Sequence, residues 1–139
     1  MPVTFRILSS RALVYVRYEG FAELQESFDA FAAYARHPDC HPGQRQFVDL
    51  TAITGVERNF VKIMELQAVK AEVFVAHGQQ TLVAYYAPSD LARNAAALAA
   101  RAWDGVSGVV ARIFDTEEAA LAFLGQAETR VADLVAKAT

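Results

Sequence analysis

Apolar and polar residues alternate at the beginning of the chain, a pattern that predicts a β-strand. Val3, Phe5 and Ile7 alternate with polar neighbours, and residues 12–18 (ALVYVRY) form a second run rich in β-forming side chains. The polar residues between the two runs predict a hairpin. Three later apolar runs predict further strands, over 45–50 (RQFVDL), 81–87 (TLVAYYA) and 109–114 (VVARIF).

The spacing of apolar residues changes to a helical period after the hairpin. The first predicted helix begins at Phe21 and stops before Pro38, because the residue before a proline disfavours the helical conformation. Its apolar face consists of Phe21, Leu24, Phe28, Phe31 and Ala35.

A second, longer helix is predicted from about Val56 to about His77. Thr54 and Glu57 have the spacing of a capping box, in which each side chain binds an amide at the helix start. Gly78 is suited to close the helix in a left-handed conformation. Residues 73–76 (VFVA) could instead form a strand, but good helix formers precede them, and two parallel strands need a helix between them.

Two more helices are predicted, each with a hydroxyl side chain as its N-cap. Ser89 precedes a helix whose apolar face is Leu91, Ala95, Leu98 and Ala102. Thr116 precedes a final helix with the stripe Leu121, Leu124, Val131 and Leu134 or Val135, which continues into a C-terminal helical extension over 126–139.

The predicted order is therefore β-β-α-β-α-β-α-β-α within one domain spanning residues 1–139. Strands that alternate with helices indicate an α/β fold, here a mixed sheet of about five strands with mainly parallel central strands. We expect the helices to pack mainly on one face of this sheet.

Composition narrows the possible partners and the compartment. Hydrophobic residues make up 54% of the 139 residues, whereas 16 acidic and 13 basic side chains give a net charge of −3. Nucleic acid is not an expected partner, because no excess of cations is present, and no apolar run is long enough to span a bilayer. The sequence MPVTFRILSS reads as a strand rather than a secretory signal. With Cys40 as the only cysteine, a reducing cytoplasm is the expected compartment.

Residues 47–60 (FVDLTAITGVERNF) resemble the anti-anti-sigma, or SpoIIAA-like, family of STAS-type domains. That family has a central strand ending in Asp-Leu-Ser or Asp-Leu-Thr, as in residues 49–51, followed by a short loop and a helix. Residues 87–93 (APSDLAR) and 112–124 (RIFDTEEAALAFL) extend the similarity. The resemblance implies a STAS-type sheet and a regulatory, protein-binding role.

The chain departs from this family at the phosphorylated position. In the phosphorylated members, a serine nine residues after the strand's aspartate accepts phosphate from a kinase, and an aspartate precedes it. Counting from Asp49, these positions hold Arg58 and Glu57. A guanidinium has no hydroxyl to phosphorylate, so phosphate transfer to Arg58 is not expected.

Few residues have the chemistry of a catalytic or metal site. His37, Cys40 and His41, with Asp39 between them, form one metal-like cluster, but a structural site usually has four ligands at recognisable spacings, so we expect no metal and no other cofactor. Cys40 would need an oriented base to act as a nucleophile.

Other polar and aromatic residues have structural explanations that we prefer. Asp49 could be a general base at a strand end, but an aspartate there more often accepts amide hydrogens of the following loop. Tyr85 and Tyr86 should point to opposite faces of their strand. Trp103 is expected in the core or in a dimer contact.

Two functions remain open, and an enzyme is a third, weaker alternative. The first is a non-catalytic binding or regulatory module, a homodimer that contacts a protein partner through Thr51, Thr54, Glu57, Arg58 and Asn59. The second is a carrier of a small apolar or lipid-like molecule, similar to CRAL-TRIO-type proteins. It is suggested by the broad apolar surface of the second helix, on which Phe60, Met64 and Phe74 could face a ligand.

Overall fold

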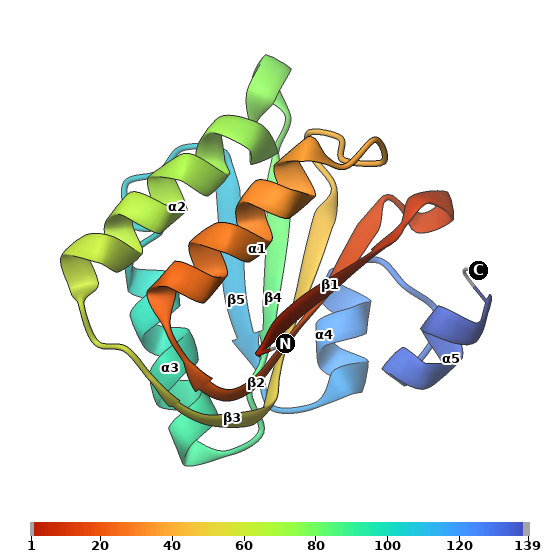
Figure 1. Cartoon of the computed structure of the whole chain (residues 1–139). Coiled ribbons are helices and arrows are strands. Elements are labelled where there is room, and N and C mark those ends of the chain that lie inside the picture. The colour runs from red at the N-terminus through yellow and green to blue at the C-terminus, as the bar shows by residue number, and fades with distance from the viewer. Residues whose placement is uncertain (1, 138–139) are drawn as a thin grey trace.

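A mixed sheet of five strands forms the centre of the computed structural model, which describes residues 2–137 (Figure 1). The strands lie in the sheet in their order along the chain, with β1 antiparallel to β2 and the other neighbours parallel. This arrangement confirms the predicted α/β fold and its mixed five-stranded sheet. The strands are β1 (Val3–Leu8), β2 (Leu13–Ala22), β3 (Arg45–Val56), β4 (Thr81–Tyr86) and β5 (Val109–Phe114).

Three helices cover one face of the sheet, and two shorter helices cover part of the other (Figure 1). The three-helix face carries α1 (Leu24–Arg36), α2 (Phe60–Phe74) and α3 (Asp90–Arg101), and the two-helix face carries α4 (Glu117–Phe123) and α5 (Val131–Lys137). Strand pleating divides adjacent residues between the faces. Tyr85 therefore packs in the core of the three-helix face and Tyr86 against that of the two-helix face, as predicted.

The third and fourth predicted helix starts are confirmed. The side chain of Ser89 accepts a hydrogen bond from the amide of Ala92 at 3.1 Å, and that of Thr116 accepts one from Ala119 at 3.2 Å. Leu91, however, is 43% exposed, because the inward face of α3 is formed by the small residues Ala92, Ala95 and Ala96. Small side chains let this helix approach β3 and β5 closely.

The predicted start of the second helix at Val56 is wrong. β3 continues through Val56 and pairs in parallel with the end of β2, and α2 begins only at Phe60. The capping box does not form, since the Glu57 carboxylate accepts the Leu24 amide at 3.0 Å and so binds the start of α1 instead. Pairing with β2 and the β-branched residues of the segment outweigh the local capping signal.

Asn59 is the N-cap of α2, since its side-chain oxygen accepts the Lys62 amide at 3.2 Å. We expect Asn59→Ala to lower the free energy of unfolding by about 1 kcal/mol, the usual effect of losing a cap. Thr54→Ala should change it by less than about 0.5 kcal/mol, because Thr54 is exposed within β3. Urea denaturation of both variants checks this. An equal loss in both, or a larger loss in Thr54→Ala, would contradict the assignment.

The other end of α2 agrees with the helical interpretation of residues 73–76 up to Phe74. A short 3-10 turn over Ala76–Gly78 follows, in which His77 and Gly78 both have positive φ. The segment 73–76 therefore contains no strand.

The first helix begins three residues later than predicted, at Leu24. Phe21 still belongs to β2 and is 53% exposed, and Ala35 also faces solvent. The buried residues of α1 are Leu24, Ser27, Phe31 and Tyr34. The strand extends past Phe21 because its partner β3 is longer than the apolar run at 45–50 indicates.

The predicted final helix is divided into α4 and α5. Gly125 has φ +76°, a conformation that ends a helix and that glycine adopts without steric cost. The predicted stripe is nevertheless buried, because Leu121, Leu124, Val131 and Leu134 all pack in the core of the two-helix face. The helical extension, up to Lys137, thus folds back onto the domain, and its last two positions, 138–139, lie outside the described residues.

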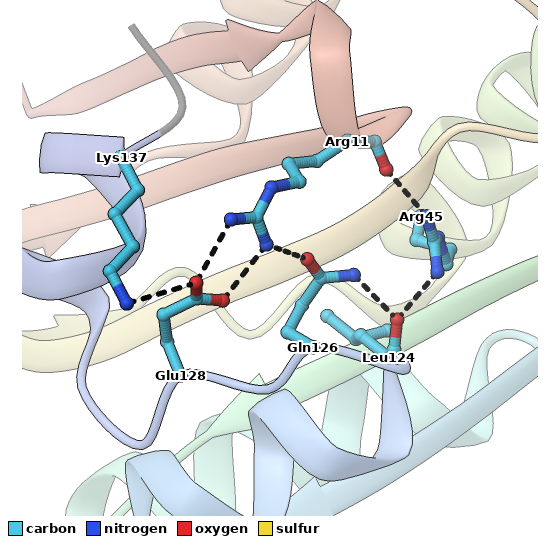
Figure 2. Close-up of polar contacts among 6 residues, drawn as sticks. All are labelled: Arg11, Arg45, Leu124, Gln126, Glu128 and Lys137. Atoms are coloured by element: carbon cyan, nitrogen blue, oxygen red, sulfur yellow. Dashed lines mark hydrogen bonds and ion pairs between the residues drawn. The ribbon is translucent and has the colours of Figure 1, made fainter.

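Charged side chains fasten the segment between α4 and α5 to the turn between β1 and β2 (Figure 2). The Arg11 guanidinium donates to both carboxylate oxygens of Glu128, at 2.8 and 2.9 Å, and to the Gln126 side chain at 2.9 Å. Arg45 donates to the carbonyls of Leu124, at 2.7 Å, and Arg11. The bonds from Arg11 to Gln126 and Glu128 join residues more than a hundred positions apart in the sequence.

The Arg11 hydrogen bonds lower the pKa of Glu128 from 4.5 to about 2. A carboxylate with a lowered pKa in the folded state stabilises the protein above its unfolded pKa, and this contribution disappears as the pH falls toward the folded pKa. Glu128→Gln should therefore have a lower melting temperature than wild type at neutral pH, and the difference should shrink between about pH 5 and pH 2. Glu118→Gln, at an exposed position on α4, is the control. A difference that does not depend on pH would contradict this role.

Among residues 2–137, no helix combines the length and the apolar character that crossing a membrane requires.

Candidate functional site

An apolar cavity lies between the three-helix face of the sheet and helices α1, α2 and α3. Its volume is about 110 Å³. Strands β1 to β4 form its floor and the helices its walls and roof, with α2 contributing Ile63, Leu66, Gln67, Lys70 and Phe74. Lys70 is the only charged residue among those that line it.

Apolar side chains from both layers make up most of the lining. Those from the strands are Val3, Phe5, Val14, Val16, Val48, Leu50, Ile53 and Val83, and those from α1 and α3 include Leu24, Phe31, Ala95 and Leu98. Aromatic rings close the end of the cavity near the C-terminus of α2, where the Phe74 ring lies 5.7 Å from that of Phe31 and 6.0 Å from that of Trp103. Trp103 is thus a core residue, 5% exposed.

A few polar groups interrupt this apolar surface, and most of them bind one another. The hydroxyls of Tyr18 and Ser27 are 3.0 Å apart, and the Trp103 indole N–H donates to the Tyr85 hydroxyl at 2.9 Å. The side-chain amide of Gln67 donates to the carbonyl of Ala99 at 3.0 Å. These hydrogen bonds hold each of these polar side chains of the cavity lining in one position.

These polar groups are uncharged. Burial raises the pKa of Tyr85 to about 12, an effect that the hydrogen bond from the Trp103 indole only partly offsets. A phenol with this pKa stays protonated at neutral pH. Apart from the half-buried Lys70, the lining offers no charge to a bound ion. The cavity is accordingly suited to a neutral molecule, because most of its surface could not replace the hydration that an ion would lose.

The predicted protein-contact residues lie along the end of β3 and the loop before α2. Thr51, Thr54, Arg58 and Asn59 are exposed, and Glu57 is half-buried through its bond to the start of α1. Arg58 belongs to the loop and not to the first turn of a helix. A shallow surface groove here is lined by Phe21, Gly55, Val56, Arg58, Leu91 and Asn94.

The three predicted ligand-facing residues of α2 are not in one place. Phe74 lines the cavity, whereas Met64 is 48% exposed on the outer side of the helix. Phe60 packs with Leu24, Ile63 and Leu66 between the helices, and the Arg101 guanidinium lies 4.9 Å from the centre of its ring.

The metal-like cluster of the sequence forms a surface turn after α1. The Asp39 amide donates to Nδ1 of His37 at 3.0 Å, and the His41 amide donates to the side chain of Gln44. Cys40 is half-buried. Over residues 2–137, no three or more histidine, cysteine or acidic side chains gather in a way that could hold a metal ion.

Asp49 is buried near the middle of β3 and is fully engaged in hydrogen bonds. One carboxylate oxygen accepts the amide and the hydroxyl of Thr51, at 2.9 and 2.6 Å, and the other accepts the Tyr15 hydroxyl and the Arg17 guanidinium, at 2.5 and 3.2 Å. Burial and Asp49 together raise the pKa of Tyr15 to about 12. Asp49 thus accepts a nearby backbone amide, as expected, but the residues that follow it continue β3 and do not form the predicted loop.

The sequence did not identify Tyr18, Ser27 and Gln67 as site residues. One signal was available for Gln67, because it lies four residues after Ile63 and seven before Phe74, within the buried stripe of α2. A polar residue inside such a stripe points to a polar contact in the core. No comparable signal exists for Tyr18 and Ser27, which are close only because β2 packs against α1.

No family model matches this chain, and the comparisons with curated proteins and with solved structures likewise find no significant match.

Proposed function

We propose that this protein binds a small, largely apolar, neutral molecule in the cavity beneath α2. The cavity itself carries the proposal, because its 110 Å³ are enclosed mainly by aliphatic and aromatic side chains. Cavities of comparable size and lining, about 150 Å³, stay dry and take up benzene. A molecule of one aromatic ring suits this volume.

The size argues against the lipid-like ligand that the sequence suggested. Pockets for drug-sized ligands measure about 300–1,000 Å³, well above the volume of this cavity. A long acyl chain would require α2 to move away from the sheet and would expose Ile63, Leu66 and Phe74, which are 4–5% exposed in the structure. A one-ring molecule needs no such movement.

Toluene and palmitate are suitable probes for this proposal. At ten times its dissociation constant, toluene should stabilise the folded state by about 1.4 kcal/mol and raise the melting temperature by a few degrees. Palmitate should have no such effect.

Two leucine substitutions at alanine positions of α3 test whether toluene binds inside the cavity. Ala95→Leu adds a side chain to the cavity wall and should abolish the toluene effect, whereas Ala97→Leu, at an exposed position on the same helix, should preserve it. A wild-type protein that toluene does not stabilise, or equal stabilisation of both variants, would contradict binding in this cavity.

Protein binding is the second candidate, and the surface groove beside Arg58 favours it. Phe21 and Leu91, 53% and 43% exposed, place apolar side chains next to Arg58 and Asn94. Apolar residues beside a guanidinium are common in protein interfaces. This second candidate function is the one that goes with the proposed membership of the SpoIIAA-like family and with the proposed homodimer.

Two experiments separate the possible partners of the groove. Analytical ultracentrifugation should show a dimer that Phe21→Ser weakens, if a second copy is the partner. A pull-down in which Arg58→Glu retains every partner of the wild-type protein would argue against this surface.

A further inference from the structure

The geometry points to Gln67 as the group that selects the ligand, with its side-chain oxygen Oε1 accepting a hydrogen bond from a hydroxyl or N–H of the bound molecule. The inference rests on the proposed function and adds the chemical class of the ligand to it. The preferred occupant is then a one-ring molecule with a single hydrogen-bond donor, such as a phenol.

Gln67 has one satisfied and one unsatisfied end. Its side chain is 2% exposed and lines the cavity, and its Nε2 group donates to the Ala99 carbonyl at 3.0 Å. Oε1 is the only buried side-chain nitrogen or oxygen among residues 2–137 that has no hydrogen-bond partner. Buried polar atoms without partners are rare in proteins and costly, so such an atom beside a cavity indicates a ligand group.

The orientation of the amide is fixed by its neighbour. The Ala99 carbonyl is among the last four of α3, a position that lacks an amide partner within the helix, and a carbonyl can only accept. Turning the amide over would bring two oxygens together and break this bond. The acceptor end of Gln67 therefore remains the unpaired end, and only a hydrogen-bond donor can satisfy it.

Other polar groups of the lining are less available than Gln67 Oε1 to accept a hydrogen bond from a ligand. The Tyr18 and Ser27 hydroxyls bind each other, and the Tyr85 hydroxyl receives the Trp103 indole. Lys70, on the same side of α2 and one turn beyond Gln67, is half-buried and is itself a donor. Gln67 is thus the acceptor around which a neutral donor would be recognised.

Three probes of nearly equal size test the inference by calorimetric titration of the full chain: phenol, toluene and anisole. Phenol offers a donor, toluene has no polar group, and anisole offers only an acceptor. We expect phenol to bind wild-type protein about tenfold more tightly than toluene or anisole, the difference of one net hydrogen bond. Gln67→Met has a similar shape without the acceptor, so this preference should disappear in it while toluene still binds.

The outcomes distinguish the inference from the proposed function. Equal binding of phenol and toluene to the wild-type protein would overturn the role of Gln67 and leave the cavity as an apolar site, with an internal water as the partner of Oε1. A phenol preference that survives in Gln67→Met would assign recognition to another group and also overturn it. Binding of none of the three probes would overturn the proposed function together with this inference. The wild-type comparison is decisive even if Gln67→Met does not fold.

Discussion

Replacement of Leu121 by alanine should lower the free energy of unfolding by about 2–5 kcal/mol, the range measured for buried leucines. Leu121 is 0% exposed and lies at the centre of the two-helix face. It packs in one cluster with Leu13 and Phe47 of the sheet and with Leu134 of α5. Truncation would leave a cavity that these neighbours, all of them on regular elements, cannot close. Urea denaturation followed by circular dichroism measures the loss.

Leu91→Ala is the matched control, because Leu91 is a helical leucine that is 43% exposed. It should change the free energy of unfolding by less than about 0.5 kcal/mol. A loss below about 1 kcal/mol in Leu121→Ala would mean that α4 and α5 do not form a packed layer with the sheet. The two-helix face would then contribute little to the stability of the domain.

The central part of the fold follows directly from the sequence. In residues 81–86 the pleat of a strand determines burial, so Tyr85 and Tyr86 must face opposite layers whatever their neighbours are. Ser89 and Thr116 cap their helices through bonds to amides three residues away. Features that depend on such short separations are readable from sequence alone.

The boundaries that were missed depend on partners far away in the chain. Residues 52–56 extend β3 because β2 lies beside them, and the Glu57 side chain binds the start of α1 rather than that of α2. Both partners are more than thirty positions away. Local signals, such as the spacing of Thr54 and Glu57, could not show which of two helices a capping side chain serves.

The candidate cavity could be anticipated only in part. The broad apolar surface of α2 indicated that something must cover it, and of the three residues predicted to face a ligand only Phe74 lines the cavity. Its volume, however, is set by how closely α1, α2 and α3 approach the sheet, and its polar groups come from β2, α1, α2 and β4. No spacing in the sequence relates Tyr18 or Ser27 to Gln67.

Shortening Phe74 should change the size of molecule that the cavity accepts. The Phe74 ring fills the space between Phe31 and Trp103, whereas its carbonyl, which accepts the Gly43 amide and the Thr81 hydroxyl, is unaffected by substitution. We expect Phe74→Ala to lower the free energy of unfolding by about 3–5 kcal/mol and to admit a two-ring molecule such as naphthalene, which wild-type protein excludes. Fluorescence of Trp103, the only tryptophan, reports the binding.

A loss of this size is a large fraction of the stability of a typical domain, about 5–15 kcal/mol, so Phe74→Leu provides a milder enlargement. Leu121→Ala is the control for destabilisation alone, because it opens space on the two-helix face and should leave naphthalene excluded. Naphthalene binding by the Phe74 variants but not by Leu121→Ala would show that the volume beneath α2 limits ligand size. Equal binding by all of these proteins, or by none of them, would contradict a ligand site bounded by Phe74.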